Sequence, residues 1–353
     1  MLFVIPACVK EGPPGLDGAD GADGVAGADG ADGEVACLVC HSTEVKEDNE
    51  REYFRSQHAS GALSLDYAGG RDGCAECHSG NGFVEWVETG DVTANITPEA
   101  INCNTCHDIH STFAVEDYAL RITTPVDVIG VTVDLGNSSN LCVNCHKPRR
   151  GWEDYDDGSL ADSVMVTSTH AGPHHGPQTA VLMGLGGDHR IGSIDASAIG
   201  PSTHGTDVED ATCVGCHMYE STDESEGGHT WWPAVESCKV CHATATDFDY
   251  KGGQTKIDLL MAQLAELLEA QEGQKIAESA PRAGDWHVVP GTVHGIIHFD
   301  EEDKAYHPVI GQFDRDVFSA FWNFMTILED RSHGVHNPAY AEALLLNAIE
   351  ILD

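Results

Sequence analysis

The stretch SNLCVNCHKP, residues 139–148, contains a five-residue pattern that occurs six times in this chain of 353 residues. The pattern is Cys, two further residues, Cys and then His. Two thiols three positions apart share one face of a helical turn, where both can add to the vinyl groups of a single porphyrin. The imidazole that follows is then placed to bind the iron as its proximal ligand. We therefore interpret the pattern as the attachment motif of haem c.

The six motifs use twelve of the 13 cysteines. Zinc ribbons and thioredoxin-like sites also contain Cys-x-x-Cys, but neither needs a His after the second Cys, and disulfides would leave the histidines unexplained. The sequence therefore predicts six haem c groups. Numbered along the chain, the first to sixth motifs are Cys37, Cys40 and His41; Cys74, Cys77 and His78; Cys103, Cys106 and His107; Cys142, Cys145 and His146; Cys213, Cys216 and His217; and Cys238, Cys241 and His242.

Fourteen further histidines are available as the second axial ligand of each iron. Two imidazoles on every iron imply low reduction potentials, because axial Met raises them and Met is scarce here. Of three clustered histidines, His170, His174 and His175, we choose His174 without separating it firmly from its neighbours. His294, His298 and His307 are kept in reserve, as distal ligands or as a surface metal site. From their positions near the motifs, the predicted distal ligands are His58, His110, His174, His204 and His229.

Three short segments carry a family resemblance. GGHTWWP (227–233), HHGPQ (174–178) and HGVHNPAY (333–340) resemble multihaem cytochromes of dissimilatory metal-reducing bacteria. The HNP element is also similar to the group of ammonia-forming nitrite reductases and hydroxylamine oxidoreductases. In that group the His before Asn-Pro is a distal haem ligand, so the resemblance implies this role for His336. The nitrite reductases of that group usually have Lys in place of the motif His at the active haem. All six motifs of this chain end in His.

The charge of the chain narrows the class of its partners. Eighteen Lys and Arg against 58 Asp and Glu give a formal net charge of −40 at pH 7. Such a surface repels nucleic acid and anionic lipid, and it favours cationic partners, metal ions or positively charged minerals. Solubility in a salty medium is the alternative explanation. Beyond the apolar start, no stretch reaches the roughly 20 apolar residues of a membrane helix.

Residues 1–36 are predicted to be a signal remnant with a lipid anchor, followed by an acidic spacer. The segment MLFVIPA before Cys8 resembles the end of a bacterial lipoprotein signal, which makes Cys8 the lipidated residue; a free thiol is the alternative. Glycine recurs at every third position from Gly12 to Gly33, as in collagen. Few prolines and several aspartates without cationic partners favour a solvated spacer over a triple helix.

Residues 37–250 are predicted to form the hexahaem domain. This segment is irregular and rich in Gly, Asp, Ser and Thr, and its motifs are too closely spaced for each haem to have an apolar core of its own. The expected fold is mostly irregular with α-helices, wrapped around a chain of closely packed haems, with few or no strands. Since such cytochromes mature outside the cytoplasm, we expect export to the outer membrane surface or beyond.

Residues 251–353 are predicted to be a helical region. One helix with an apolar stripe begins with Thr255 as its cap, and a second covers 316–330. The third begins with Asn337 as its cap and Pro338 at its first helical position. Such stripes indicate packing against the haem domain or an oligomer contact.

Three functions remain open at this point. The leading hypothesis is an electron carrier, rather than an enzyme, that passes electrons to metal oxides or to other multihaem cytochromes. The alternative is a multihaem oxidoreductase acting on nitrite or hydroxylamine, which needs one open iron position. The third is a homo-oligomer or filament subunit with haems stacked between chains. The sequence does not choose among donors and acceptors.

Overall fold

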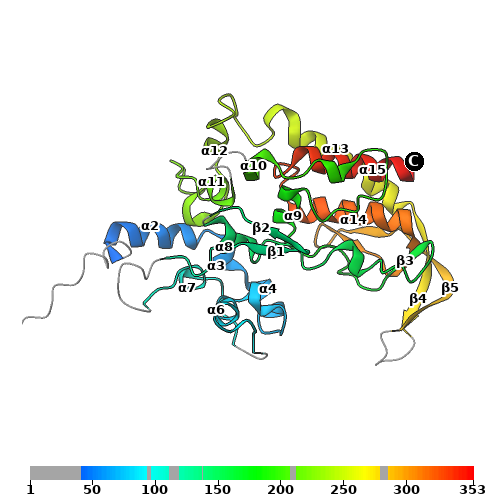
Figure 1. Cartoon of the computed structure of the whole chain (residues 1–353), viewed down its shortest axis with the longest axis horizontal. Coiled ribbons are helices and arrows are strands. Elements are labelled where there is room, and N and C mark those ends of the chain that lie inside the picture. The colour runs from blue at the N-terminus through cyan, green and yellow to red at the C-terminus, as the bar shows by residue number, and fades with distance from the viewer. Residues whose placement is uncertain (1–40, 94–96, 111–118, 137, 207–211, 279–284) are drawn as a thin grey trace, which may run out of the picture.

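The computed structural model describes residues 41–93, 97–110, 119–136, 138–206, 212–278 and 285–353. Over these residues the chain forms 14 α-helices and eight strands in three sheets. Figure 1 shows an elongated molecule with α2 (Thr43–Tyr53) at one end and the long C-terminal helices towards the other. Cys8, Cys37 and Cys40 lie outside the described residues, as does the Gly-X-Y repeat.

The elements that precede residue 250 are short and are joined by loops. The α-helices after α2 are α3 (Gln57–Ser60), α4 (Ala62–Ala68), α5 (Ala75–His78), α6 (Gly80–Thr89), α7 (Cys103–Cys106), α8 (Ser139–Val143), α9 (Gln178–Met183), α10 (Thr203–Thr206), α11 (Cys213–His217) and α12 (Val235–Lys239). Single 3-10 turns are η2 (Trp152–Asp154), η3 (Ala196–Ala198), η4 (Gly228–Thr230) and η5 (Tyr250–Gly252).

The second to sixth motifs each overlap one of these short helices, namely α5, α7, α8, α11 and α12, and the fourth and sixth motifs continue past the ends of α8 and α12. In four of them the motif His donates its backbone N–H to the carbonyl of the first motif Cys, which closes one turn. These N···O distances are 3.0 Å at His78, 2.9 Å at His107, 2.9 Å at His146 and 2.7 Å at His242. One turn of helix therefore sets the two thiols and the imidazole on a common face.

The prediction of few or no strands is wrong, because the fold mixes helices with three antiparallel sheets. The four-stranded sheet has the order β3-β8-β4-β5, and the other two sheets are the hairpins β1-β2 and β6-β7. The strands are β1 (Val126–Val128), β2 (Val131–Val133), β3 (Ser163–Val166), β4 (Glu272–Glu278), β5 (Trp286–His294), β6 (Ile297–Asp300), β7 (Ala305–Pro308) and β8 (Gly311–Asp314).

The sequence pattern did not predict these strands, because they are short, polar or paired with strands far away in the sequence. β1 and β2 have three residues each and are joined by Ile129 and Gly130, whose φ angles of 45° and 81° suit a tight hairpin turn. β5 contains Pro290 and Gly291, residues that count against a strand. β3 pairs with β8, with Ser163 opposite Asp314, although the two strands are far apart in the sequence.

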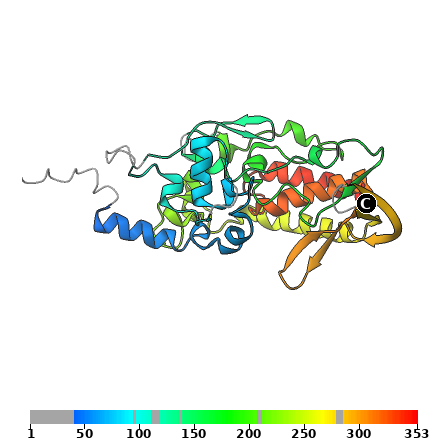
Figure 2. The ribbon, with the colours of Figure 1, turned by 90° about the horizontal axis from the view of Figure 1, so that it is seen from below.

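The last hundred residues contain the three predicted helices, with the strands β4 to β8 between them. α13 (Gly253–Glu269), α14 (Arg315–Asp330) and α15 (Pro338–Leu352) lie side by side in Figures 1 and 2, and α15 contacts both of the others. α14 is buried along most of its length, including Phe321 and Trp322. The Trp322 indole Nε1 donates a hydrogen bond of 2.7 Å to the carbonyl of Gly186, which ties this core to the preceding loops.

The helix starts confirm one predicted cap and correct the other. Asn337 caps α15 by accepting a hydrogen bond from the backbone N–H of Tyr340, and Pro338 is at the first position, as predicted. Thr255 is not the cap of α13, which begins two residues earlier at Gly253. The Asp249 carboxylate accepts from both the N–H and the hydroxyl of Thr255, a capping role that the sequence did not reveal.

The C-terminal helices share their core with residues that precede position 250. Val164, Val166, Val181 and Ile191 are buried in the same apolar cluster as α13, α14 and α15. By contrast, the described apolar side chains buried between residues 41 and 125 are few and mostly small: Ala68, Ala75, Phe83 and Val92. The division at residue 250 stays a prediction, but the main apolar core reaches across it.

Phe321→Ala should lower the free energy of unfolding by about 3 to 5 kcal/mol, because the ring is fully buried and its removal leaves a cavity. Denaturant unfolding followed by far-ultraviolet circular dichroism measures the change. The control is Leu259→Ala, since Leu259 on α13 is 67% exposed. Equal stabilities of the two variants would contradict this description of the core.

Candidate haem sites

Each of the six motif histidines has the ring of one further histidine close to its own. The ring centres of these six histidine pairs are 5.9 to 6.4 Å apart. In motif order, the histidine pairs are His41 with His110, His78 with His174, His107 with His229, His146 with His58, His217 with His336, and His242 with His204.

This spacing fits a metal ion held between two imidazoles. A metal–nitrogen bond of about 2.0 Å on each side, and about 1.1 Å from nitrogen to ring centre, place the two ring centres about 6 Å apart. The angle between the ring planes is free, because each plane contains the metal axis. It ranges from 8° for His41 and His110 to 87° for His204 and His242. The residues therefore suit haem iron with two axial histidines.

The predicted distal residues are the ones that the structure brings beside the motif histidines. His110 follows His107 by three residues, yet its ring lies beside His41 of the first motif. His336 comes from the loop between α14 and α15 and reaches His217. Iron ligation itself stays a prediction for all twelve histidines, and so do the thioether bonds.

The cluster of three histidines resolves geometrically in favour of His174. Its ring centre is 5.9 Å from that of His78. His175 instead places its Nδ1 2.9 Å from a carboxylate oxygen of Glu329, and the ring of His170 is tilted by 42° against that of Tyr67, with centres 6.4 Å apart. His174 also has a φ of 72°, an uncommon backbone state for a residue with a side chain.

Burial keeps several of these imidazoles neutral, which is the state that binds a metal. Burial, with a smaller contribution from the neighbouring His146, lowers the pKa of His58 to about 4. Burial also lowers the pKa of His174 to about 4, with added repulsion from His175 and His78. Both rings therefore offer a lone pair at neutral pH without first losing a proton.

Backbone carbonyls orient other members of the pairs. The Nδ1 of His217 lies 2.8 Å from the carbonyl of Trp231, and the Nδ1 of His204 lies 2.8 Å from the carbonyl of Val335. Donation from Nδ1 leaves Nε2 as the free nitrogen of each ring, the usual arrangement of a metal-binding His. The sequence did not reveal these partners, because they are main-chain atoms of separate loops.

His336 has a buried carboxylate as the hydrogen-bond partner of its Nδ1. The Nδ1 lies 2.6 Å from an oxygen of Asp330, whose side chain has no exposed surface. The Ser332 hydroxyl donates to the other carboxylate oxygen, so the group is held from both sides. Burial lowers the pKa of His336, but the charge and hydrogen bond of Asp330 outweigh it and the net shift is upward.

The motif cysteines lie close to those of other motifs. Cys77 and Cys145 are close enough for each thiol to shift the pKa of the other, and so are Cys142 and Cys213. In a haem-bound protein these sulfurs would be thioethers, and only their closeness would remain. The fourth motif therefore neighbours both the second and the fifth. Cys106 of the third motif is also within electrostatic range of the fourth.

The fold resembles that of one solved protein, the outer cell wall cytochrome OcwA. The TM-score is 0.51 and the identity is 19%, and the match covers 86% of this chain and 50% of that one. The chain shares its fold with a cytochrome. It spans about half the length of OcwA, and no family model or curated protein sequence matches it. Among the described residues, no helix is long and apolar enough to cross a membrane.

His58→Ala should leave one iron with an open axial position, because it removes the ring beside His146. Electron paramagnetic resonance of the oxidised protein should show only low-spin haems in the unaltered chain and one high-spin haem of six in the variant. His170→Ala is the matched control, because His170 is not in a histidine pair. A variant spectrum without a high-spin signal would contradict ligation by His58.

Asp330→Asn should raise the reduction potential of one haem, because the buried carboxylate favours the ferric state with its extra positive charge. Loss of a charged hydrogen bond costs about 1.5 kcal/mol, which is on the order of 60 mV for a one-electron couple. Spectroelectrochemical titration measures the shift. The control is Asp258→Asn. It removes a similar bond of 2.6 Å to His333, which is exposed and lies beside no motif histidine. Equal potentials in both variants would argue against this role.

Proposed function

We propose that the chain is a hexahaem c-type cytochrome that carries electrons, each iron being held by two histidines. The observation that carries this proposal is the pairing of every motif histidine with one further histidine. With both axial positions filled, an iron accepts and gives electrons but has no site for a substrate. The fold shared with OcwA supports the assignment at the level of architecture.

The order of the motifs in space suggests a connected path with a branch. His107 and His110, three residues apart, serve the third and first motifs, so these two haems would be neighbours. The thiol contacts then lead from the fourth motif to the second and to the fifth. Cys216 of the fifth motif is within electrostatic range of both cysteines of the sixth. The proposed path is therefore 1–3–4–5–6, with the second haem attached at the fourth.

The proposed setting is extracellular electron transfer. Haem c attachment, the resemblance to cytochromes of metal-reducing bacteria and the net charge of −40 support an exported protein at the outer membrane surface or beyond. Its proposed partners are metal oxides or other multihaem cytochromes, and nucleic acid is not among them. Membrane attachment would come through lipidated Cys8, and association into a homo-oligomer or filament is a further proposal.

An oxidoreductase acting on nitrite or hydroxylamine is the competing function. It rests on the likeness of the HNP element, residues 336–338, to that enzyme group. Such an enzyme needs one iron with an exchangeable position, whereas every motif histidine here has a second imidazole beside it. The geometry therefore favours the carrier. Turnover of nitrite or hydroxylamine at rates that outpace simple electron acceptors would reverse this preference.

The reduced protein should reduce ferric chelates broadly, and it should react faster with cationic acceptors than with anionic ones. The reason is its charge of −40, which attracts cations and is screened as salt rises. Stopped-flow oxidation by size-matched cationic, neutral and anionic acceptors measures the ratio of rates. The ratio should fall between low salt and about 1 M, where the Debye length is about 3 Å. Rates independent of acceptor charge would contradict the electrostatic part.

A further inference from the structure

The hairpin β6-β7 brings metal-binding side chains to one face. Ile297 pairs with Pro308, His298 with His307, and Asp300 with Ala305 across the two strands. Since successive side chains alternate between faces, His298, Asp300 and His307 share the face opposite to the buried Ile297 and Pro308. The short turn after β6 adds Asp303. No motif cysteine and none of the histidine pairs belongs to this hairpin.

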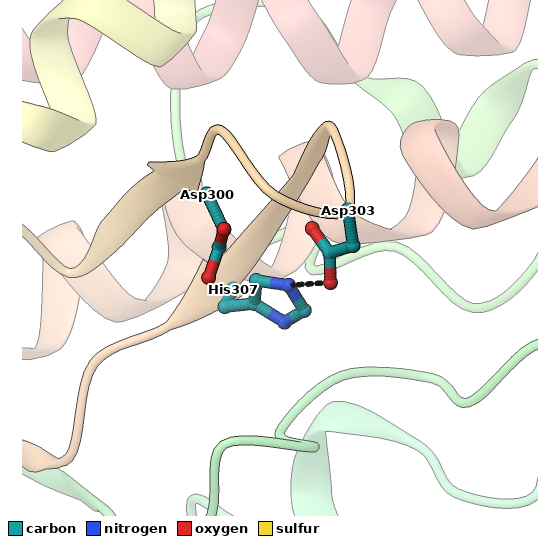
Figure 3. Close-up of side chains that lie close together, drawn as sticks. All are labelled: Asp300, Asp303 and His307. Atoms are coloured by element: carbon teal, nitrogen blue, oxygen red, sulfur yellow. Dashed lines mark hydrogen bonds and ion pairs between the residues drawn. The ribbon is translucent and has the colours of Figure 1, made fainter.

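Three of these side chains converge on one point. One donor atom each of Asp300, Asp303 and His307 lie within 4.8 Å of one another, and Figure 3 shows the His307 ring between the two carboxylates. The Nε2 of His307 is 2.7 Å from an oxygen of Asp303. The ring centre of His298, on the neighbouring strand, is 5.7 Å from that of His307.

The backbone holds the two carboxylates in place. The N–H of Glu302 donates to Oδ1 of Asp300 over 2.7 Å, and the N–H of Ala305 donates to Oδ1 of Asp303 over 3.0 Å. The second oxygen of each carboxylate remains available beside His307. Lys304, the cation of this turn, forms its ion pair with Glu301. The cluster therefore presents two anionic groups and one imidazole, and each carboxylate is held through one of its oxygens before any ion arrives.

We propose that Asp300, Asp303 and His307 bind one divalent transition-metal ion through two carboxylate oxygens and the Nε2 of His307. Tetrahedral bonds of about 2.0 Å place donor atoms about 3.3 Å apart, so only a small closure of the cluster is needed. An imidazole donor favours zinc-like or iron-like ions over calcium and magnesium, which prefer oxygen alone. Water completes the coordination on the exposed side. This site is independent of the haem assignment and of the proposed function.

The test is zinc binding by the full-length protein with its haems in place. After removal of loosely bound metal with a chelator, equilibrium dialysis against zinc and elemental analysis give zinc per chain, with the protein concentration taken from amino-acid analysis. His307→Ala and Asp303→Asn should each lose one zinc ion relative to the unaltered chain. His287→Ala, which removes an exposed His on β5, should lose none.

Two further measurements test the class of metal ion and the location of the site. A large excess of magnesium should leave the zinc bound, since magnesium does not favour an imidazole ligand. Zinc should raise the thermal midpoint of the unaltered chain and of His287→Ala, but less that of His307→Ala, because binding stabilises the folded state. Equal zinc content in all four proteins would overturn the proposal, as would displacement of the zinc by magnesium.

Discussion

The contact between a motif imidazole and a second, distant imidazole is the constraint on which the first half of this molecule depends. Two rings about 6 Å apart gain little from each other directly, so the spacing makes sense as two ligands of one metal. Between residues 41 and 125 the described core is limited to a few small groups around Phe83. The polypeptide there is arranged so that haem would supply the apolar interior that the sequence lacks.

The second half of the molecule is held together by apolar packing, and the two halves meet at the loop between α14 and α15. This loop follows a conventional apolar core, in which Phe321, Trp322 and Leu344 are fully buried. From the loop, His336 pairs with His217, while the carbonyl of Val335 orients His204. The apolar core therefore positions the histidines that lie beside His217 of the fifth motif and His242 of the sixth. This gives the apolar helical unit a role in arranging the proposed haem sites.

The sequence indicates candidate haem-attachment motifs more directly than it indicates the architecture. Covalent haem attachment requires Cys, Cys and His within one turn, so the motifs are visible without any structure. The three long helices were also visible, because α13, α14 and α15 carry apolar stripes. The strands were not, since β3 pairs with β8 across most of the second half and β5 is interrupted by Pro290. Pairing of particular histidines was equally hidden, because it depends on loops such as that of His110, whose φ of 60° no local pattern specifies.

The histidines that lie beside the fifth and sixth motif histidines have different hydrogen-bond partners. His336 of the fifth motif pair has a buried carboxylate behind it, whereas His204 of the sixth has a neutral carbonyl. A haem at the fifth position would therefore hold its electron less tightly than one at the sixth. Val240, inside the sixth motif, is 66% exposed, and Trp232, six residues before the first Cys of that motif, is 47% exposed. If the chain carries electrons as proposed, the buried carboxylate behind His336 makes the fifth haem the better electron donor of these two neighbours and the sixth haem the better acceptor.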